Sequence, residues 1–405
     1  MNRFFATYID AFEGITKDIW VFASMMLINR LGTLILPFLT LYTTSELGWS
    51  KIDAGTATMS FGIGSLAGAL LGGYLTDRFG YYRTMMISLF AASGFFFSLQ
   101  FATDFYILCG LLFVSSMMSD LLRPALMTGI TFFTNKNTQT RAVSLMRMAF
   151  NLGLSVGPFF AGGLIEWYGY NLIFIVDSLT CLSAGIFLVL FVKDVNREDS
   201  VMKSDISNRQ KTSPYTDYKF MMFMFFSLCM LVSFFQMLFT VPLFMAEELG
   251  YTERHVGYFF GANGLLIFLT EMPLVHYLEK RYDNFRVMKF GALMMGLAIL
   301  IFIFPFPSIV LIVFYTLFVS YGEIINFPFI ASTSMDRASE HNIGKYMSVN
   351  TVMFSTSLIL APIVGTGLLE KFGYTVLFSV MFTLCLISIF GLKILKEEFY
   401  PKSDL

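Results

Sequence analysis

The chain has 405 residues, of which 56% are hydrophobic and only 14% are charged, and its formal net charge is −1. Soluble domains carry about 25% charged residues, so we expect most of this surface to face lipid. The near-neutral balance excludes the basic face that a nucleic-acid binder needs, so we expect no nucleic-acid partner.

About twelve apolar segments are long enough to cross a membrane as helices, since roughly 20 such residues span the hydrocarbon core. The spans are 17–43, 52–75, 84–102, 106–132, 138–165, 170–192, 218–246, 253–278, 287–304, 307–333, 340–369 and 372–395. The longest polar stretch, 193–217, divides them. The sequence therefore predicts an all-α membrane protein with an N-terminal six-helix bundle (1–192), a cytoplasmic linker (193–217) and a C-terminal six-helix bundle (218–405).

Lys and Arg residues gather on alternate loops between these spans. With the N-terminus in the cytoplasm, the opposite side holds only Lys51, Arg254 and Lys371, which stand at or between the ends of spans. Short cytoplasmic loops of membrane proteins are enriched in Lys and Arg. The sequence therefore predicts that both termini lie in the cytoplasm.

The two sets of spans repeat each other. Segment 140–170 aligns without gaps on 344–374, with matching residues Pro158 and Pro362, and segment 73–85 resembles 276–288. The tripeptide Glu-Leu-Gly at 46–48 recurs at 248–250. An even number of spans in each half keeps both copies in the same orientation, so we expect two pseudo-symmetric bundles related by an axis along the membrane normal.

A charged motif occupies the loop between the second and third spans. Its residues are Gly73, Asp77, Arg78, Gly80 and Arg83. The motif resembles the GxxxDRxGRRxxL signature of the major facilitator superfamily, with Tyr81 and Tyr82 at two of its basic positions. The resemblance covers essentially the whole chain and implies the major facilitator fold in a bacterial inner membrane. It also implies that this loop latches the two halves in one conformation; the alternative is an ordinary charged cytoplasmic loop.

A glycine-rich motif lies in the fifth span. Its residues are Gly153, Gly157, Pro158, Gly162 and Gly163. The motif resembles the GxxxGPxxGG pattern of proton-driven antiporters in the same superfamily. Small residues four apart also let helices approach closely, so a packing role stays open as the alternative.

Carboxyl groups inside the spans are the candidates for proton coupling, because a charge at the bilayer centre costs at least about 2.5–3.5 kcal/mol. They are Glu323, Asp120, Glu271 and Asp177. Desolvation favours the neutral form of a carboxyl, and no Lys or Arg stands in the tenth span with Glu323. We therefore expect Glu323 to bind and release the proton; the alternative is that it only contacts substrate.

The resemblance implies that the first, fourth, seventh and tenth spans line a central substrate cavity. The candidates there, with one residue of the fifth span, are Asn29, Arg30, Thr33, Arg123, Arg147, Gln236, Thr240 and Asn326. Asp120 stands three residues before Arg123, so these two residues and Arg30 have an alternative interpretation as an ion-pair network that neutralises itself.

The sequence favours a secondary transporter, a proton-coupled antiporter that exports small amphiphilic molecules such as drugs or peptides. The alternatives are proton-coupled uptake of a nutrient or siderophore, and a lipid-linked flippase. A membrane-embedded enzyme is disfavoured, because His255, His276 and His341 lie at loop ends and no phosphate-binding loop is present. We expect a monomer that binds substrate, protons and the lipid bilayer, with no cofactor and no metal.

Overall fold

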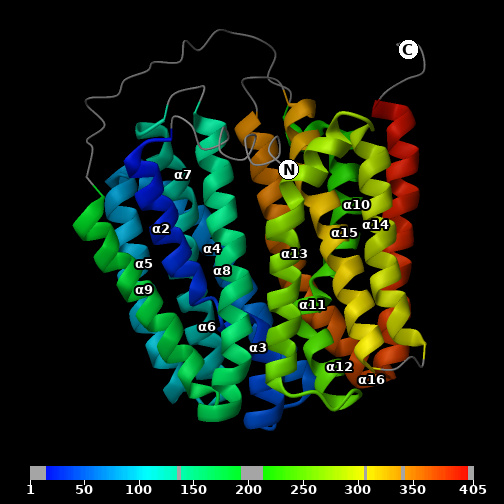
Figure 1. Cartoon of the computed structure of the whole chain (residues 1–405), viewed down its shortest axis with the longest axis horizontal. Helices are drawn as coiled ribbons and strands as arrows, with labels where there is room; N and C mark the ends of the chain where they lie inside the picture. Colours follow the sequence, from blue (N-terminus) through cyan, green and yellow to red (C-terminus); the bar gives the residue numbers. More distant parts are fainter. Residues whose placement is uncertain (1–14, 135–137, 193–212, 305–307, 339–342, 400–405) are drawn as a thin grey trace, which may run out of the picture. The chain divides into compact units, whose positions relative to one another are not determined.

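The computed structural model describes residues 15–134, 138–192, 213–304, 308–338 and 343–399, which are mostly helical (Figure 1). Within this part of the chain, ten helices are long and apolar enough to cross a membrane. The number is eleven when the bent pair Glu253–Glu271 and Pro273–Glu279 is taken as one span. The candidate span Lys345–Lys396 covers two predicted spans, because its helix changes direction at Gly373. Each predicted span overlaps one of these helices, and the all-helical membrane fold is confirmed.

The residues form two compact units. Unit 1 comprises Met1–Ile35 and Ile63–Asp205, and unit 2 comprises Leu36–Gly62 and Ile206–Leu405. Residues 36–62 thus group with unit 2, although they precede the linker in the sequence. The predicted boundaries at 1–192, 193–217 and 218–405 describe the sequence repeat and stay a prediction.

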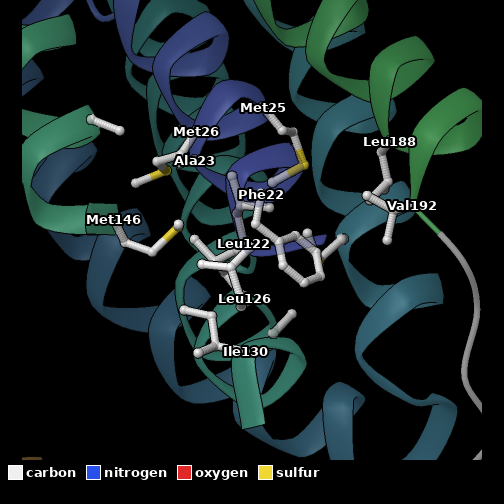
Figure 2. Close-up of a cluster of buried hydrophobic side chains, with 14 of the residues drawn as sticks. Phe22, Ala23, Met25, Met26, Leu122, Leu126, Ile130, Met146, Leu188 and Val192 are labelled. Carbon is white, nitrogen blue, oxygen red and sulfur yellow. The ribbon is translucent and has the colours of Figure 1, made fainter. Parts of the chain in front are cut away.

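Unit 1 is a bundle in which α2 packs against α8 and α9, while α5 packs against α6, α7 and α9. Its helices are α2 (Lys17–Leu31), α5 (Tyr81–Ser98), α6 (Phe105–Asp120), α7 (Leu122–Phe132), α8 (Gln139–Tyr168), α9 (Asn171–Phe191) and the later part of α4 (Lys51–Phe79). Figure 2 shows buried side chains of its core, among them Phe22, Leu126, Met146 and Leu188. Close packing of this kind, through van der Waals contact, is a main source of helix association in lipid.

A stripe of glycines brings α4 against α6 and α7. Gly64, Gly68 and Gly72 are spaced four residues apart, and a Cβ atom at any of them would meet the backbone of residues 113–121. At Gly68 such an atom would lie 2.3 Å from the carbonyl oxygen of Met117. The absence of side chains therefore permits the close approach that places Ser65 beside the end of α6.

Unit 2 contains the rest of the described helices, with α10 against α16 and α14 against both α15 and α16. They are α3 (Ile35–Leu41), α10 (Tyr218–Phe234), α11 (Gln236–Phe239), α12 (Val241–Glu247), α13 (Glu253–Glu279), α14 (Asn284–Leu300), α15 (Ser308–Arg337) and α16 (Ile343–Phe399). The described residues also include a π-helical turn, Tyr42–Glu46, which follows α3.

Residues 36–62 join the rest of unit 2 through polar contacts at one end of its helices. The hydroxyl of Thr40 donates to the carbonyl of Phe239 at 2.8 Å, and Lys51 pairs with Glu247 at 2.6 Å. The backbone N–H of Ile52 donates to Glu370 at 2.7 Å. These contacts fasten a segment of the first sequence repeat to the second repeat, at the end predicted to face outward.

The internal repeat is visible in the backbone. Gly48 and its repeat partner Gly250 have φ angles of 68° and 67°, and Gly169 and Gly373 have 80° and 77°. Positive φ is readily adopted by glycine and costs other residues steric strain. Matching glycines therefore turn the chain in the same way at corresponding helix ends.

Candidate functional site

The first span is broken between α2 and α3. The helix α2 ends at Gly32, and the N–H of Thr33 bonds the carbonyl of Arg30 at 3.2 Å. The first backbone N–H groups of helix α3 have no acceptor within the helix, as at every helix start. Asp177 of α9 supplies this acceptor, because its carboxylate accepts from the N–H of Leu34 at 3.0 Å and from the N–H of Ile35 at 3.2 Å. Asp177 is 2% exposed, so water does not compete for these bonds.

Helices α8 and α9 pack closely against the break in the first span, at glycine positions that leave no room for a side chain. A Cβ atom on Gly32 would lie 1.7 Å from the hydroxyl oxygen of Thr180 on α9. A Cβ atom on Gly153 of α8 would lie 2.5 Å from Cβ of Arg30, and one on Gly157 would lie 2.7 Å from the carbonyl oxygen of Leu31. Two glycines of the predicted antiporter motif are therefore packing positions against α2.

The remaining motif residues differ in their surroundings. Pro158 is buried inside α8, and the Cβ position of Gly163 has open space within 4 Å. Gly162 is buried in the same helix. The packing interpretation thus describes Gly153 and Gly157, while a role in antiport stays a prediction for the motif as a whole.

Arg30 is the charged residue that this packing encloses. It is 7% exposed, and its Nε and Nη2 atoms have no hydrogen-bond acceptor among the described residues. Its guanidinium carbon lies 4.7 Å from the ring centroid of Phe150, over the ring face. The neighbouring Asn29 is buried as well and donates to the Sγ atom of Cys181 at 3.4 Å. Thr33, the third candidate of this segment, is half-buried.

The ion-pair network considered for Arg30, Asp120 and Arg123 is not formed at contact distance among the described residues. Asp120 is half-buried at the end of α6 and accepts a hydrogen bond from the hydroxyl of Ser65 on α4. Arg123 lies beyond the interruption at Leu121 and is exposed. The partner of Asp120 comes from another helix, so spacing along its own span could not reveal it.

Arg147, the candidate of the fifth span, is exposed on α8. It therefore differs from Arg30, which is buried on the neighbouring α2.

The cavity candidates of unit 2 use their polar atoms within the helices. The amide of Gln236 donates to the carbonyls of Val232 and Ala361 at 3.1 and 3.0 Å, and its oxygen accepts from the hydroxyl of Thr240 at 2.8 Å. Asn326 donates to the carbonyl of Gly322 at 2.8 Å. The bonds of Gln236 and Thr240 lie where the seventh span is interrupted and α10, α11 and α12 succeed one another, whereas the bond of Asn326 lies within α15.

The two carboxyl candidates of unit 2 are half-buried. Glu323 lies midway along α15, and Glu271 lies where α13 bends by 50° before Pro273. One turn from Glu323, Ser320 accepts a hydrogen bond from Asn263 of α13 at 2.9 Å. This buried polar contact was not predicted from the sequence, because Asn263 stands in the eighth span, which the resemblance does not place at the cavity. The signal available for it was an asparagine within the apolar stretch 256–269 of α13.

The predicted latch motif ends α4 and begins α5. Asp77, Arg78 and Arg83 are exposed, and Arg78 donates to the hydroxyl of Tyr74 at 3.2 Å. Gly80 has a φ of 85° and Gly73 is half-buried, which fits a tight turn between two helices.

In the second repeat, Asp283 stands at the position of Gly80, and its carboxylate caps α14 by accepting from the N–H of Arg286 at 2.9 Å. Arg281 donates to the hydroxyl of Tyr277 at 2.7 Å. This bond repeats the one between Arg78 and Tyr74 in the first repeat.

Among the described residues, no group of three or more His, Cys, Asp or Glu side chains could hold a metal ion. The chemistry of the site in unit 1 is that of binding: a desolvated cation, an aromatic face and a nearby carboxylate. Such a set attracts groups that accept hydrogen bonds or carry negative charge, and it strengthens each contact because little water is present.

Comparison with known proteins identifies the family of the chain. The sequence model of the Major Facilitator Superfamily matches residues 21–357. An uncharacterized MFS-type transporter of Bacillus subtilis, YqjV, is 25% identical over 88% of each chain. A Na(+), Li(+), K(+)/H(+) antiporter of Planococcus maritimus is 24% identical over 82% of this chain and 84% of its own. A solved POT family transporter has a TM-score of 0.79 at 15% identity, over 97% of this chain and 98% of its own. The chain belongs to the major facilitator superfamily and is a multi-span secondary transporter.

Proposed function

We propose that this transporter is a proton-coupled antiporter that exports small amphiphilic molecules through a bacterial inner membrane. The halves 1–192 and 218–405 would alternate access to a site near the midplane, with both termini in the cytoplasm and a monomer as the working unit. The loop with Asp77, Arg78 and Gly80 would latch one of the two conformations.

The observation that carries the proposal is the environment of Arg30. This residue lies about 20 Å along α2 from Lys17, inside the membrane span, and a guanidinium keeps its charge there. A charge in that position is costly unless another group compensates it. A substrate with an acceptor or acidic group would compensate it, and the ring of Phe150 would contact the apolar part of the same molecule.

Proton coupling rests on the carboxyl groups. Asp120 lies close enough to Arg30 for their charges to attract, and Ser65 donates a hydrogen bond to it. We therefore assign Asp120 as the partner of Arg30 and Ser65, and not as the group that exchanges the proton. Glu323 lies midway along α15 and is half-buried, which suits a group that water reaches in only one conformation. We therefore assign the transported proton to Glu323. The antiporter from Planococcus maritimus is consistent with exchange against protons.

Reconstituted vesicles would test the proposal. A panel of anionic, zwitterionic and cationic amphiphiles of similar size would be loaded, and efflux would be followed with and without an imposed pH gradient. We expect anionic and zwitterionic members to leave faster when the outside is acidic, with an opposing proton flux. Movement of substrate and protons in the same direction would show symport and contradict antiport. A substrate flux that does not change with the imposed pH gradient would contradict proton coupling.

A second comparison would separate substrate recognition from coupling. Arg30→Gln should lose the preference for anionic amphiphiles while its thermal unfolding stays close to that of the wild type. Lys17→Gln is the matched control, since Lys17 is an exposed cation at the start of the same helix. Equal effects of the two changes would contradict the special role of Arg30.

A further inference from the structure

Unit 2 carries a groove whose lining differs from the candidate site. It forms where the end of α13, the start of α14 and the C-terminal part of α16 meet, with Ile325 of α15 behind them, and its volume is about 910 Å³. Three cations line it, Arg286, Lys289 and Lys393, and most of the remaining lining is apolar or aromatic. None of the residues assigned to transport above lines this groove.

The three cations have no ion-pair partner among the described residues. A neighbouring cation on α16 shows the contrast, because Lys396 pairs with Asp283 at 2.8 Å. The carboxylate of Asp283 also attracts Lys289, without contact at ion-pair distance. The groove thus combines three cations with an apolar surface. That combination fits a ligand with an anionic head and an apolar tail.

The apolar part of the groove extends from the charges into the span. Leu293 lies one helical turn beyond Lys289 on α14, about 6 Å along the axis, and Leu386 lies about 10 Å before Lys393 on α16. Phe290 is 53% exposed between them. An apolar chain that enters beside the charges would therefore run along both helices in the direction of the membrane interior.

The charged end of the groove belongs to a membrane surface. Helix α14 begins there and α16 approaches its end, so the lysines stand near the ends of their spans. Tyr277 and Tyr282 line the same end, and tyrosines with this placement are typical of the membrane interface. The predicted topology puts this surface on the cytoplasmic side, where anionic lipids attract Lys and Arg.

We propose that this groove binds one anionic phospholipid. Its phosphate and anionic headgroup contact Arg286, Lys289 and Lys393, and one acyl chain lies against Phe290 and Leu293. The proposal is independent of the transported substrate, because none of the residues assigned to transport lines the groove.

Lipid binding to the full-length transporter tests the proposal. The protein would be purified in a mild detergent and titrated with phosphatidylglycerol or with phosphatidylcholine of the same acyl chains, and bound lipid would be counted by native mass spectrometry. We expect one phosphatidylglycerol to saturate at a concentration where phosphatidylcholine does not. In Lys289→Gln/Lys393→Gln its affinity should fall about tenfold, because each basic residue near a membrane surface strengthens anionic-lipid binding.

Two further proteins make the outcome decisive. Lys17→Gln/Lys345→Gln removes two exposed lysines outside the groove and should bind phosphatidylglycerol as the wild type does. Leu293→Trp fills the apolar part while it leaves all three cations, and it should also lose the lipid. Equal losses in the two lysine variants, equal binding of both lipids, saturation by glycerol phosphate alone, or full binding by Leu293→Trp would each overturn the proposal. Thermal unfolding of every variant without added lipid checks that each is folded.

Discussion

The carboxylate of Asp177 accepts the backbone N–H of Leu34 at 3.0 Å, and this bond connects α9 to the break in the first span. A membrane interior offers no water to a free N–H group, so an interrupted helix needs an acceptor from a neighbour. A carboxylate is especially suitable, because the start of a helix carries partial positive charge. The unit boundary between Ile35 and Leu36 falls directly after the same break.

Asp177→Asn should destabilise the protein by about 1–3 kcal/mol, because the new amide group would face the N–H of Ile35 and leave it unsatisfied. Thermal unfolding in detergent would measure the loss. Asp104→Asn is the matched control, since Asp104 accepts from the N–H groups of Tyr106 and Ile107 at an exposed start of α6. Asparagine caps such a start as well as aspartate does, so this variant should unfold like the wild type.

The same variant separates two roles for Asp177. Asp177→Asn with unchanged stability but no response to a pH gradient would contradict the structural role and return Asp177 to the candidates for proton transfer. Reduced stability with intact coupling in the remaining folded protein is the outcome that we expect.

Gly153→Ala should impair folding and transport, because its Cβ atom would lie 2.5 Å from Cβ of Arg30. Separating α8 from α2 to relieve this contact should cost about 1–3 kcal/mol, as overpacked interiors do. Thermal unfolding and vesicle flux would both report the change. Gly163→Ala is the control in the same helix and motif, with nothing within 4 Å of the new atom. Equal behaviour of the two variants would show that close packing against α2 is not what Gly153 provides.

The spans were predictable because apolar length alone decides what can cross a membrane. The repeat was predictable too, and Gly169 and Gly373 occupy matching turns because other residues rarely adopt their φ angles. The glycine motif indicated close packing, which the structure bears out at Gly153 and Gly157. The sequence could not reveal that α2, and Arg30 in particular, is the partner.

The hydrogen bonds of the site were less predictable, since their partners are far apart in the chain. Asp177 stays a predicted candidate for proton transfer, and its carboxylate accepts from the backbone of a segment more than 140 residues away, a contact that the sequence does not reveal. Asp120 and Arg123 looked like a pair from their spacing, whereas Ser65 holds Asp120 from another helix. The spacing of residues along the sequence predicts neighbours on one helix, but it does not predict which helices pack against each other.

Asp217 should make the stability of unit 2 depend on pH in the acidic range. Partial burial raises the pKa of this carboxyl, but hydrogen bonds from Arg337, the N–H of Phe220 and the hydroxyl of Tyr346 outweigh it, so the pKa is lower than in the unfolded chain. A lowered folded-state pKa stabilises the protein above the unfolded value of about 3.9. That stabilisation is lost as the pH falls through the folded-state pKa.

Asp217→Asn should therefore lower the free energy of unfolding at pH 7 by about 1 kcal/mol, a modest amount because Arg337 is partly exposed. The thermal unfolding temperature should fall accordingly. The difference from the wild type should shrink as the pH drops below about 4. Asp18→Asn is the control, because no hydrogen bond to the Asp18 carboxylate is found in the described part of the chain. A difference that stays constant with pH would show that Asp217 acts through packing and not through its charge.

Coupling should depend on Glu323 and not on Asp120. Glu323→Gln removes a titratable group midway along α15 while it keeps the shape and polarity of the side chain. We expect this variant to bind substrate and to exchange it between the two sides, but to gain nothing from a pH gradient. Exchange and gradient-driven flux in the same vesicles would measure the two properties, and Glu248→Gln, which changes an exposed carboxyl beyond α12, is the control.

Asp120→Asn should behave differently, because it removes a negative charge close to Arg30 and weakens the hydrogen bond from Ser65. The buried guanidinium of Arg30 then loses a negative charge that compensates it. We therefore expect lower stability or weaker substrate binding, with less effect on proton coupling. Ser65→Ala should share part of that effect, as it removes only the donor. If Glu323→Gln keeps gradient-driven transport and Asp120→Asn loses coupling alone, the assignment is reversed and the proton is carried beside Arg30.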